Sequence, residues 1–271
     1  MKNLSLSTFS LKLIAIISMG VHHTANVLWE AIPLCINAAL MFVHGVAFPI
    51  MAFFLTEGFR RTSNIKRYML RLLIFAVIAQ VPHTLAFGSF MPNIIFTILL
   101  SLLCLLMYEK MYVEKGKHGA FVTLFILIMI ASAVLTFEGG LIGTLLIFMY
   151  HVIKDEKKRR VWPLVMYGGA LALFTVFGQV AIRFLGQMSE IMPELSVIIA
   201  GEDVQGYARM SLELMQNYFF VPLGPFLIIP LLLAYNGERG RRAKWLFYAF
   251  YPGHFIVLVA IAAILGIASF S

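Results

Sequence analysis

Positive charge is confined to a few short stretches of this chain, and those stretches separate long apolar runs. Nineteen of the 21 Lys and Arg residues lie near the N-terminus or in four short loops, and hydrophobic residues make up 61% of the sequence. A soluble domain of this composition would expose far too much apolar surface. The distribution therefore predicts a chain that crosses a bilayer many times.

We expect an all-α, polytopic membrane bundle of nine spans, because ~20 apolar residues cross a hydrocarbon core ~30 Å thick. The predicted spans are 11–29, 36–59, 68–87, 92–110, 119–136, 139–153, 162–186, 217–235 and 244–268. The fifth and sixth runs are short. An eight-span bundle, in which these two meet as half-helices around Glu138, is the alternative.

The four basic loops alternate with loops that are rich in acidic residues. The basic loops are 60–71, 110–117, 154–160 and 239–244, and Lys2 and Lys12 fall on their side. Positive loops favour the cytoplasmic side, so the nine-span order places the N-terminus inside and the C-terminus outside. The net charge of +8 then reflects orientation in a cytoplasmic membrane and not nucleic-acid binding.

The sequence predicts one transmembrane domain over residues 1–271. Its one long hydrophilic stretch, 187–216, is expected outside the cell as an interfacial helix or a lid. Cys35 and Cys104 are isolated within apolar runs, which indicates neither a disulfide framework nor a metal site.

Histidines occur inside the predicted spans, where ionisable groups usually face a bundle interior or a wet cavity. His22 and His23 follow Lys12 by about ten residues, ~15 Å along a helix, and His254 follows Lys244 by the same interval. We therefore expect these three imidazoles to meet in one cavity near mid-membrane. Neutral packing histidines are the alternative, and His44 in the second span fits that alternative better.

Imidazole is suited to proton transfer because its pKa lies near neutrality. A metal site would need three or four converging ligands, and no carboxylate or thiol is predicted at the depth of the histidines, so we expect no metal. Other polar residues of the spans and their ends that we consider are Glu57, Asn93, Glu138 and Tyr251.

Residues 53–76, which contain Glu57-Gly58-Phe59-Arg60-Arg61, resemble the TraX family of membrane proteins, named for the conjugal-transfer pilin acetylase. Further stretches agree in order with that family over most of the chain, apart from about 155–220. They are 11–19, Gln80-Val81-Pro82, 85–87, 93–97, 138–143, 235–240 and 247–254.

The resemblance implies an integral-membrane acetyltransferase with acetyl-CoA as its cytoplasmic co-substrate. The acceptor would be the N-terminal amine of a secreted peptide or pilin, or a hydroxyl of a surface glycan. The chain departs from the family in two places. His22 stands where the family usually has Asp beside the histidine that matches His23, and Glu138-Gly139-Gly140 replaces Asp-Tyr-Gly.

On this reading, His23 acts as general base or transient acyl carrier, and His22 or His254 relays the proton or stabilises the oxyanion. The CoA phosphates would bind arginines of the inner loops, which offer bidentate contacts. The residues expected to hold the co-substrate are Arg60, Arg61, Asn64, Arg67, Arg71, Asn236 and Arg239.

Two other classes of function stay open at this point. Pro222, Pro225 and Pro230 interrupt the eighth span, and broken helices with mid-membrane ionisable groups are also typical of transporters. A non-catalytic assembly partner for a secreted peptide is the third reading, which His22 in place of the family acid favours.

Overall fold

The computed structural model describes residues 5–41, 43–191 and 221–267, and these residues are almost entirely helical. The helices are α1 (Thr8–Val27), α2 (Leu34–Met41), α3 (His44–Arg61), α4 (Ile65–Phe87), α5 (Ile94–Met107), α6 (His118–Val134), α7 (Gly140–Val152), α8 (Glu156–Ile191), α11 (Gly224–Leu233) and α12 (Lys244–Leu265). Short 3₁₀ turns precede α2 (η1, Trp29–Ala31) and α11 (η3, Val221–Leu223), and a π-helical segment (η2, Tyr108–Val113) continues α5. The prediction of an all-α fold is confirmed for this part of the chain.

Polar residues at the helix ends explain several of the boundaries. The side chains of Ser7, Asn64 and Asn93 accept hydrogen bonds from backbone amides of the first turns of α1, α4 and α5. Gly88 ends α4 and Gly139 precedes α7, both with positive φ, a conformation that is cheap only for glycine.

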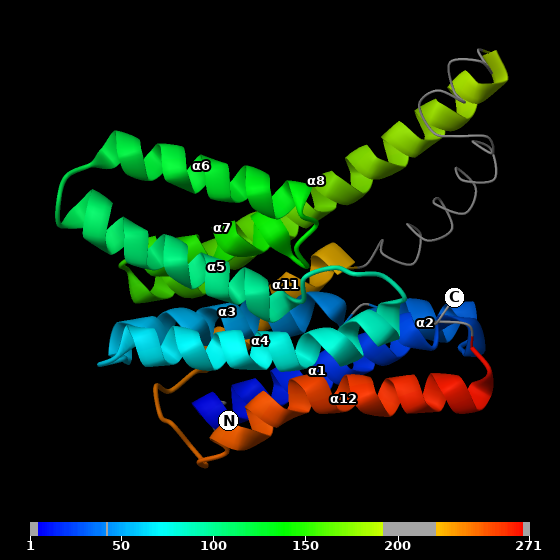
Figure 1. Cartoon of the computed structure of the whole chain (residues 1–271), viewed down its shortest axis with the longest axis horizontal. Helices are drawn as coiled ribbons and strands as arrows, with labels where there is room; N and C mark the ends of the chain where they lie inside the picture. The colour runs from blue at the N-terminus through cyan, green and yellow to red at the C-terminus, as the bar shows by residue number, and fades with distance from the viewer. Residues whose placement is uncertain (1–4, 42, 192–220, 268–271) are drawn as a thin grey trace.

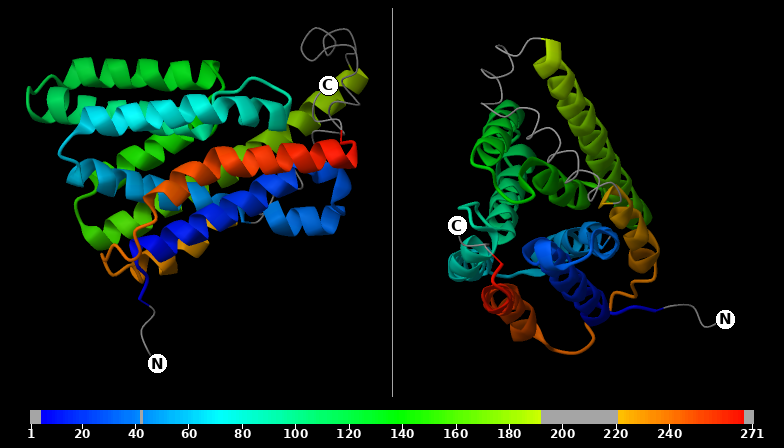
Figure 2. Two further views of the ribbon diagram at one scale, coloured as in Figure 1. Left: turned by 60° about the horizontal axis from the view of Figure 1, so that its bottom comes forward. Right: turned by 90° about the vertical axis from the view of Figure 1, so that its right-hand side faces the viewer.

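The central helices are α1 and α3. Helix α3 packs on α1, α7 and α11, while α12 lies against both α4 and α1. Figure 1 shows α12 running along α1 and α4, and the end view in Figure 2 shows how the other helices surround α3. Helix α6 lies at the periphery on α7, and the C-terminal part of α8 projects away from the bundle (Figure 1).

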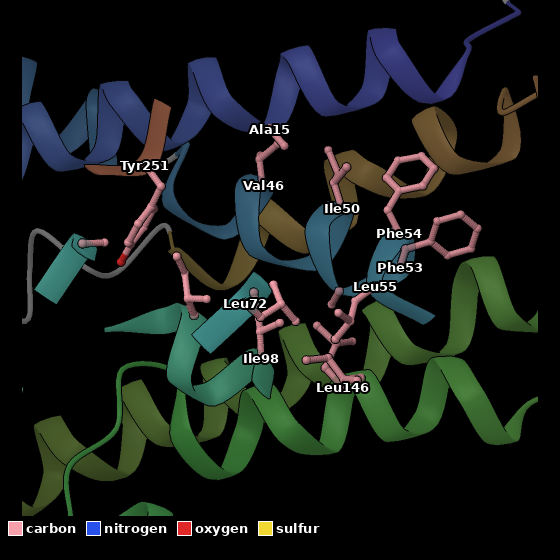
Figure 3. Packing of buried hydrophobic residues seen from close by; sticks show 14 of the residues in the cluster. Ala15, Val46, Ile50, Phe53, Phe54, Leu55, Leu72, Ile98, Leu146 and Tyr251 are labelled. Atoms are coloured by element: carbon pink, nitrogen blue, oxygen red, sulfur yellow. The ribbon is translucent and has the colours of Figure 1, made fainter. Parts of the chain in front are cut away.

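The apolar core lies where α3 meets its neighbours. Ile50 and Phe53 of α3 are fully buried, as is Leu146 of α7 to within 1%. Figure 3 shows these side chains between α1 on one side and α7 on the other. Side chains on the outer helices, such as Phe177 and Ile264, are instead exposed, as expected for surfaces that face lipid.

Four of the described helical stretches are long and apolar enough to cross a membrane: Ile65–Phe87, Ile94–Val113, Glu156–Ala181 and Trp245–Leu265. This supports a helical membrane protein. Helices α1 and α3 are not in this set, and both carry polar residues that the interior of the bundle buries. The count of nine spans stays a prediction.

Two predicted segments differ from the structure, and a third agrees with it. The second predicted span, 36–59, is two helices, α2 and α3; Pro49 has no amide to donate to the Gly45 carbonyl, which weakens helical bonding in the first turns of α3. Helices α6 and α7 are separate, in agreement with the predicted runs 119–136 and 139–153, and residues 135–139 join them. Of the expected outer segment 187–216, the structure describes only the part up to 191, where it continues α8; the rest lies outside the described residues.

Candidate functional site

His23 of α1 and His254 of α12 are in direct contact, with His23 Nδ1 2.6 Å from His254 Nε2. His254 Nδ1 lies 2.9 Å from the carbonyl oxygen of Phe250. A carbonyl can only accept, so His254 carries its proton on Nδ1 and, when neutral, accepts through Nε2. His23 therefore donates from Nδ1, and this assignment from the network leaves its Nε2 unprotonated.

A carboxylate faces that second nitrogen. Glu138 Oε1 lies 4.0 Å from His23 Nε2, and the Glu138 side chain retains 24% exposure. Its other oxygen, Oε2, accepts from the backbone amide of Ile94 at 2.7 Å and from the hydroxyl of Tyr251 at 3.3 Å. The carboxylate is thus anchored through one oxygen and directed at His23 with the other.

The α6–α7 loop is held in place by the start of α5. The Glu138 amide donates to the Pro92 carbonyl at 3.0 Å, and the Thr97 hydroxyl donates to the Glu138 carbonyl at 2.6 Å. Asn93 supports the same turn, since its side chain caps α5 and donates to the Ala76 carbonyl of α4. These bonds fix Glu138 at a helix N-terminus, which favours a negative charge.

Burial of the Glu138 carboxyl acts to raise its pKa. The neighbouring His83 and His23 and the Ile94 amide outweigh burial, so the pKa of Glu138 lies below its ordinary value. Glu138 is therefore an ionised partner for an imidazolium at His23.

His83 of α4 is a fully buried member of this cluster that our sequence reasoning missed. Its Nε2 lies 3.3 Å from Glu138 Oε2, although neither ring nitrogen is aligned for a hydrogen bond with any residue that the structure describes. The ring packs against Phe87 and Phe255. The signal was present, because His83 is an ionisable residue inside an apolar run.

His22 is buried beside His23, with the ring centroids 5.1 Å apart. Its Nε2 lies 2.9 Å from the Asn26 side-chain nitrogen, which can only donate, so neutral His22 carries its proton on Nδ1. The structure thus brings the three predicted histidines together. His23 lies near the C-terminal end of α1 whereas His254 lies in the middle of α12, so the two do not lie at matching positions along their helices.

One cavity of about 510 Å³ runs past this cluster. Its wall includes His22, His23, Glu138 and Tyr251, and also Lys12, which lies 11 residues, or ~16 Å, before His23 on α1. Such a volume is typical of small-molecule sites. The cavity therefore joins the histidine cluster to the end of the bundle that carries the basic residues.

Only two of the seven residues expected to hold the co-substrate, Arg71 and Arg239, line this cavity. The structure places the other five elsewhere, most of them in local structural contacts. Arg60 donates to the His151 carbonyl at the end of α7, Arg61 pairs with Glu57, Asn64 caps α4, Asn236 accepts from the Glu238 amide, and the exposed Arg67 lies away from the cavity.

Two candidates from the sequence remain, Glu57 and His44. Glu57 forms a 2.7 Å ion pair with the buried Arg159, which joins α3 to α8. The side chain of His44 is outside the part that the structure describes.

Three cavity cations, Lys12, Arg241 and Arg242, were not among the residues predicted to bind the co-substrate. Lys12 could have been identified, because it precedes Met19 by seven residues and His23 by eleven, so all three share one face of a helix. Among the described residues, no three His, Cys, Asp or Glu side chains are arranged as metal ligands.

Comparison with known proteins gives two matches. A family model described as TraX protein matches residues 7–262. A probable fimbrial assembly protein FimC, serogroup H1, from Dichelobacter nodosus is 27% identical over 278 residues, covering 95% of this chain and 96% of that protein. No solved structure matches the chain.

Proposed function

The chain belongs to the TraX family, and from this we propose that it is an acetyltransferase of the cytoplasmic membrane. It transfers an acetyl group from cytoplasmic acetyl-CoA to an acceptor presented from the outer side. The acceptor is an amine, such as the N-terminus of a secreted peptide or pilin subunit, or a hydroxyl of a surface glycan. The similarity to a protein named as a fimbrial assembly protein supports the pilin among these.

The observation that carries this proposal is the position of His23. Its Nε2 faces Glu138, and its Nδ1 is occupied by His254, on the wall of a cavity whose opposite end is cationic. Acetyl-CoA, a thioester with an anionic head group, fits a cavity that is cationic at one end. Its phosphates would bind at the cationic end, and its pantetheine arm would carry the thioester toward His23.

In the proposed reaction, His23 Nε2 removes a proton from the acceptor amine or hydroxyl. At the same time, the lone pair of the acceptor nitrogen or oxygen attacks the thioester carbonyl carbon. A C–N or C–O bond forms, the C–S bond breaks, and CoA leaves as a thiolate that takes up the proton from His23. Glu138 Oε1 lies 4.0 Å from His23 Nε2, which is too far for a hydrogen bond, so Glu138 acts on His23 through its charge.

Two partners hold His23 in the form that this reaction needs. His254 accepts from Nδ1 and so fixes the tautomer, while Glu138 stabilises the imidazolium that proton transfer creates. Glu138 thereby serves as the acid that residue 22 does not supply in this chain. His22, which carries its proton on Nδ1, is assigned to the oxyanion of the tetrahedral intermediate.

The test is turnover of acetyl-CoA by protein purified into lipid nanodiscs, with mass spectrometry of a pilin-derived peptide. His23→Ala is expected to reduce turnover by at least ~10²-fold, the usual contribution of a general base. His118→Ala removes an exposed histidine away from the cavity and is the matched control. Undiminished product with His23→Ala would exclude His23 as the base.

A non-catalytic role in pilus assembly is the second candidate, and the name of the similar fimbrial protein favours it. That role predicts a peptide that copurifies in fixed ratio with no acetylated product. A transporter would instead drive uptake into vesicles without a covalent product.

A further inference from the structure

The cationic end of the cavity is formed by Lys12, Arg71, Arg239, Arg241 and Arg242. None of the ion pairs among the described residues includes any of these five. Arginines elsewhere on this side of the bundle do meet carboxylates: Arg61 and Arg159 pair with Glu57, and Arg160 pairs with Glu156. The cavity end therefore concentrates positive charge that nearby acidic residues do not neutralise.

Two of these cations are held by the fold. Lys12 Nζ lies between the rings of Phe54 and Phe247, 5.4 and 5.7 Å from their centroids. Arg71 lies 5.8 Å from the Tyr68 ring, and its Nε is buried without an acceptor in the part of the chain that the structure describes. Aromatic rings orient a cation but do not neutralise its charge, so Lys12 and Arg71 are both positioned to bind an anion.

The loop that carries the three remaining arginines is fixed by the N-terminal segment of the chain. Residues 5–9 run beside residues 234–239. The backbone bonds are Leu6 N to Ala234 O (2.9 Å), Asn236 N to Leu6 O (3.0 Å), Thr8 N to Glu238 O (2.8 Å) and Phe9 N to Arg239 O (3.2 Å). We call residues 5–9 the N-terminal strap. Through it, two segments that lie far apart in the sequence build one end of the cavity.

Gly240 shows how closely the strap fits. It has φ +67°, and a Cβ at this position would lie 2.5 Å from Ser7 Oγ and 3.0 Å from Phe9 Cβ. Gly237, three residues earlier, has φ +81°, but a Cβ added there would have no neighbouring atom within 4 Å. The two glycines share the backbone conformation and differ in contact with the strap.

We infer that Lys12, Arg71, Arg239, Arg241 and Arg242 form a binding site for a nucleotide that carries three phosphate groups, and that the N-terminal strap positions its arginines. A diphosphate bridge plus a third phosphate ester supplies several negative charges and planar oxygen pairs, which match guanidinium forks and a lysine ammonium. The inference rests on the proposed function, because it assigns the phosphate-bearing part of the acetyl donor.

The first test compares Arg71→Gln with Arg67→Gln. The two residues lie one helical turn apart on α4 and lose the same charge, but only Arg71 lines the cavity. CoA binding to protein in phosphatidylcholine nanodiscs is expected to weaken about tenfold or more for Arg71→Gln and Lys12→Met. Arg67→Gln is expected to bind like the wild type. Adenosine 3′,5′-bisphosphate should compete with CoA and pantetheine should not.

The second test compares Gly240→Ala with Gly237→Ala, each of which places a side chain at a positive φ. Gly240→Ala is expected to raise the Kd for CoA several-fold more than Gly237→Ala, because only Gly240→Ala displaces the strap. If Gly240→Ala does not fold, the comparison of Arg71→Gln with Arg67→Gln still decides whether the cavity end binds CoA. Equal Kd values for Arg71→Gln and Arg67→Gln would overturn the site, and equal values for the glycine pair would overturn the role of the strap.

Lipid phosphate offers the same chemistry as nucleotide phosphate. In phosphatidylglycerol nanodiscs, a loss of CoA binding by the wild type would assign the site to lipid head groups and overturn the nucleotide inference. Acetyl transfer with the same KM for CoA in both arginine variants would refute this site and leave the acetyltransferase proposal standing. CoA binding through Arg71 without any acetyl product would do the reverse.

Discussion

Replacing Glu138 by Gln removes one charge from the site and little else. The amide keeps the size of the side chain and an oxygen that can accept from the Ile94 amide, so the α6–α7 loop should keep its place on α5. What is lost is the negative charge 4.0 Å from His23 Nε2. Two unit charges at about 4 Å interact by ~4 kcal/mol at an effective dielectric constant of ~20.

That energy matters only once His23 has become an imidazolium, so it stabilises the transition state more than the ground state. At ~1.4 kcal/mol for each factor of ten, the upper limit is a ~10³-fold loss in kcat. Because the proton is only partly transferred in the transition state, we expect a loss of ~10²- to 10³-fold. The KM for acetyl-CoA should change little, since the carboxylate lies far from the cationic end of the cavity.

The assay is the initial rate of acetyl-CoA turnover in nanodiscs, measured against pH. Tyr251→Phe is the control, because it removes the hydroxyl that donates to Glu138 Oε2 and keeps the charge. One hydrogen bond of ~1 kcal/mol corresponds to a loss of ~5-fold. A Glu138→Gln protein that keeps more than a tenth of wild-type kcat would refute the electrostatic role.

Three further predictions concern other parts of the molecule. His83→Phe should lower kcat by ~10-fold and move the acidic limb of the pH–rate profile to higher pH, because the pKa of Glu138 loses one of the influences that lower it; His118→Phe, which changes an exposed histidine away from the cavity, should stay near wild type. Gly45→Ala should destabilise the protein by ~1–3 kcal/mol, seen as a lower Tm, because its Cβ would lie 2.6 Å from Pro225 Cδ, whereas Gly169→Ala, with open space, should not lower the Tm. Arg159→Met should destabilise the protein by ~1–3 kcal/mol, because the mostly buried Glu57 carboxylate loses one of its two arginine partners and keeps only the exposed Arg61. A second change of Glu57 to Leu should recover part of that loss in thermal unfolding; additive losses would contradict the pairing.

The helices could be predicted from the sequence because each depends on a local property. Runs such as 68–87 and 244–268 are apolar over the length of a span, and the observed α4 and α12 coincide with them closely. The break between α2 and α3 was not predicted, because the apolar run continues across it and hydropathy alone does not detect a change of direction.

The contact between His23 and His254 was predicted from similar spacing along two spans, although the structure places the two at unequal positions on their helices. His83 was missed for a physical reason. Its role depends on Glu138, which reaches it from a loop 55 positions later in the sequence, and no local pattern records that contact.

The arginines that we propose to bind the donor were the least predictable. Loop charge predicts a cytoplasmic face, but Arg60 and Arg71 look alike in the sequence. Only the fold shows that Arg60 donates a hydrogen bond to the His151 carbonyl while Arg71 lines the cavity. Tertiary contacts decide which cation remains available.

The pairing of residues 5–9 with residues 234–239 has a consequence for biosynthesis. Residue 234 is synthesised 225 positions after residue 9, so this end of the cavity stays incomplete while the helices between the two segments are made. A nascent chain cannot complete this part of the wall until the segment before α12 has emerged. A polypeptide stalled before position 234 would therefore lack this part of the cavity wall, however well its earlier helices had folded.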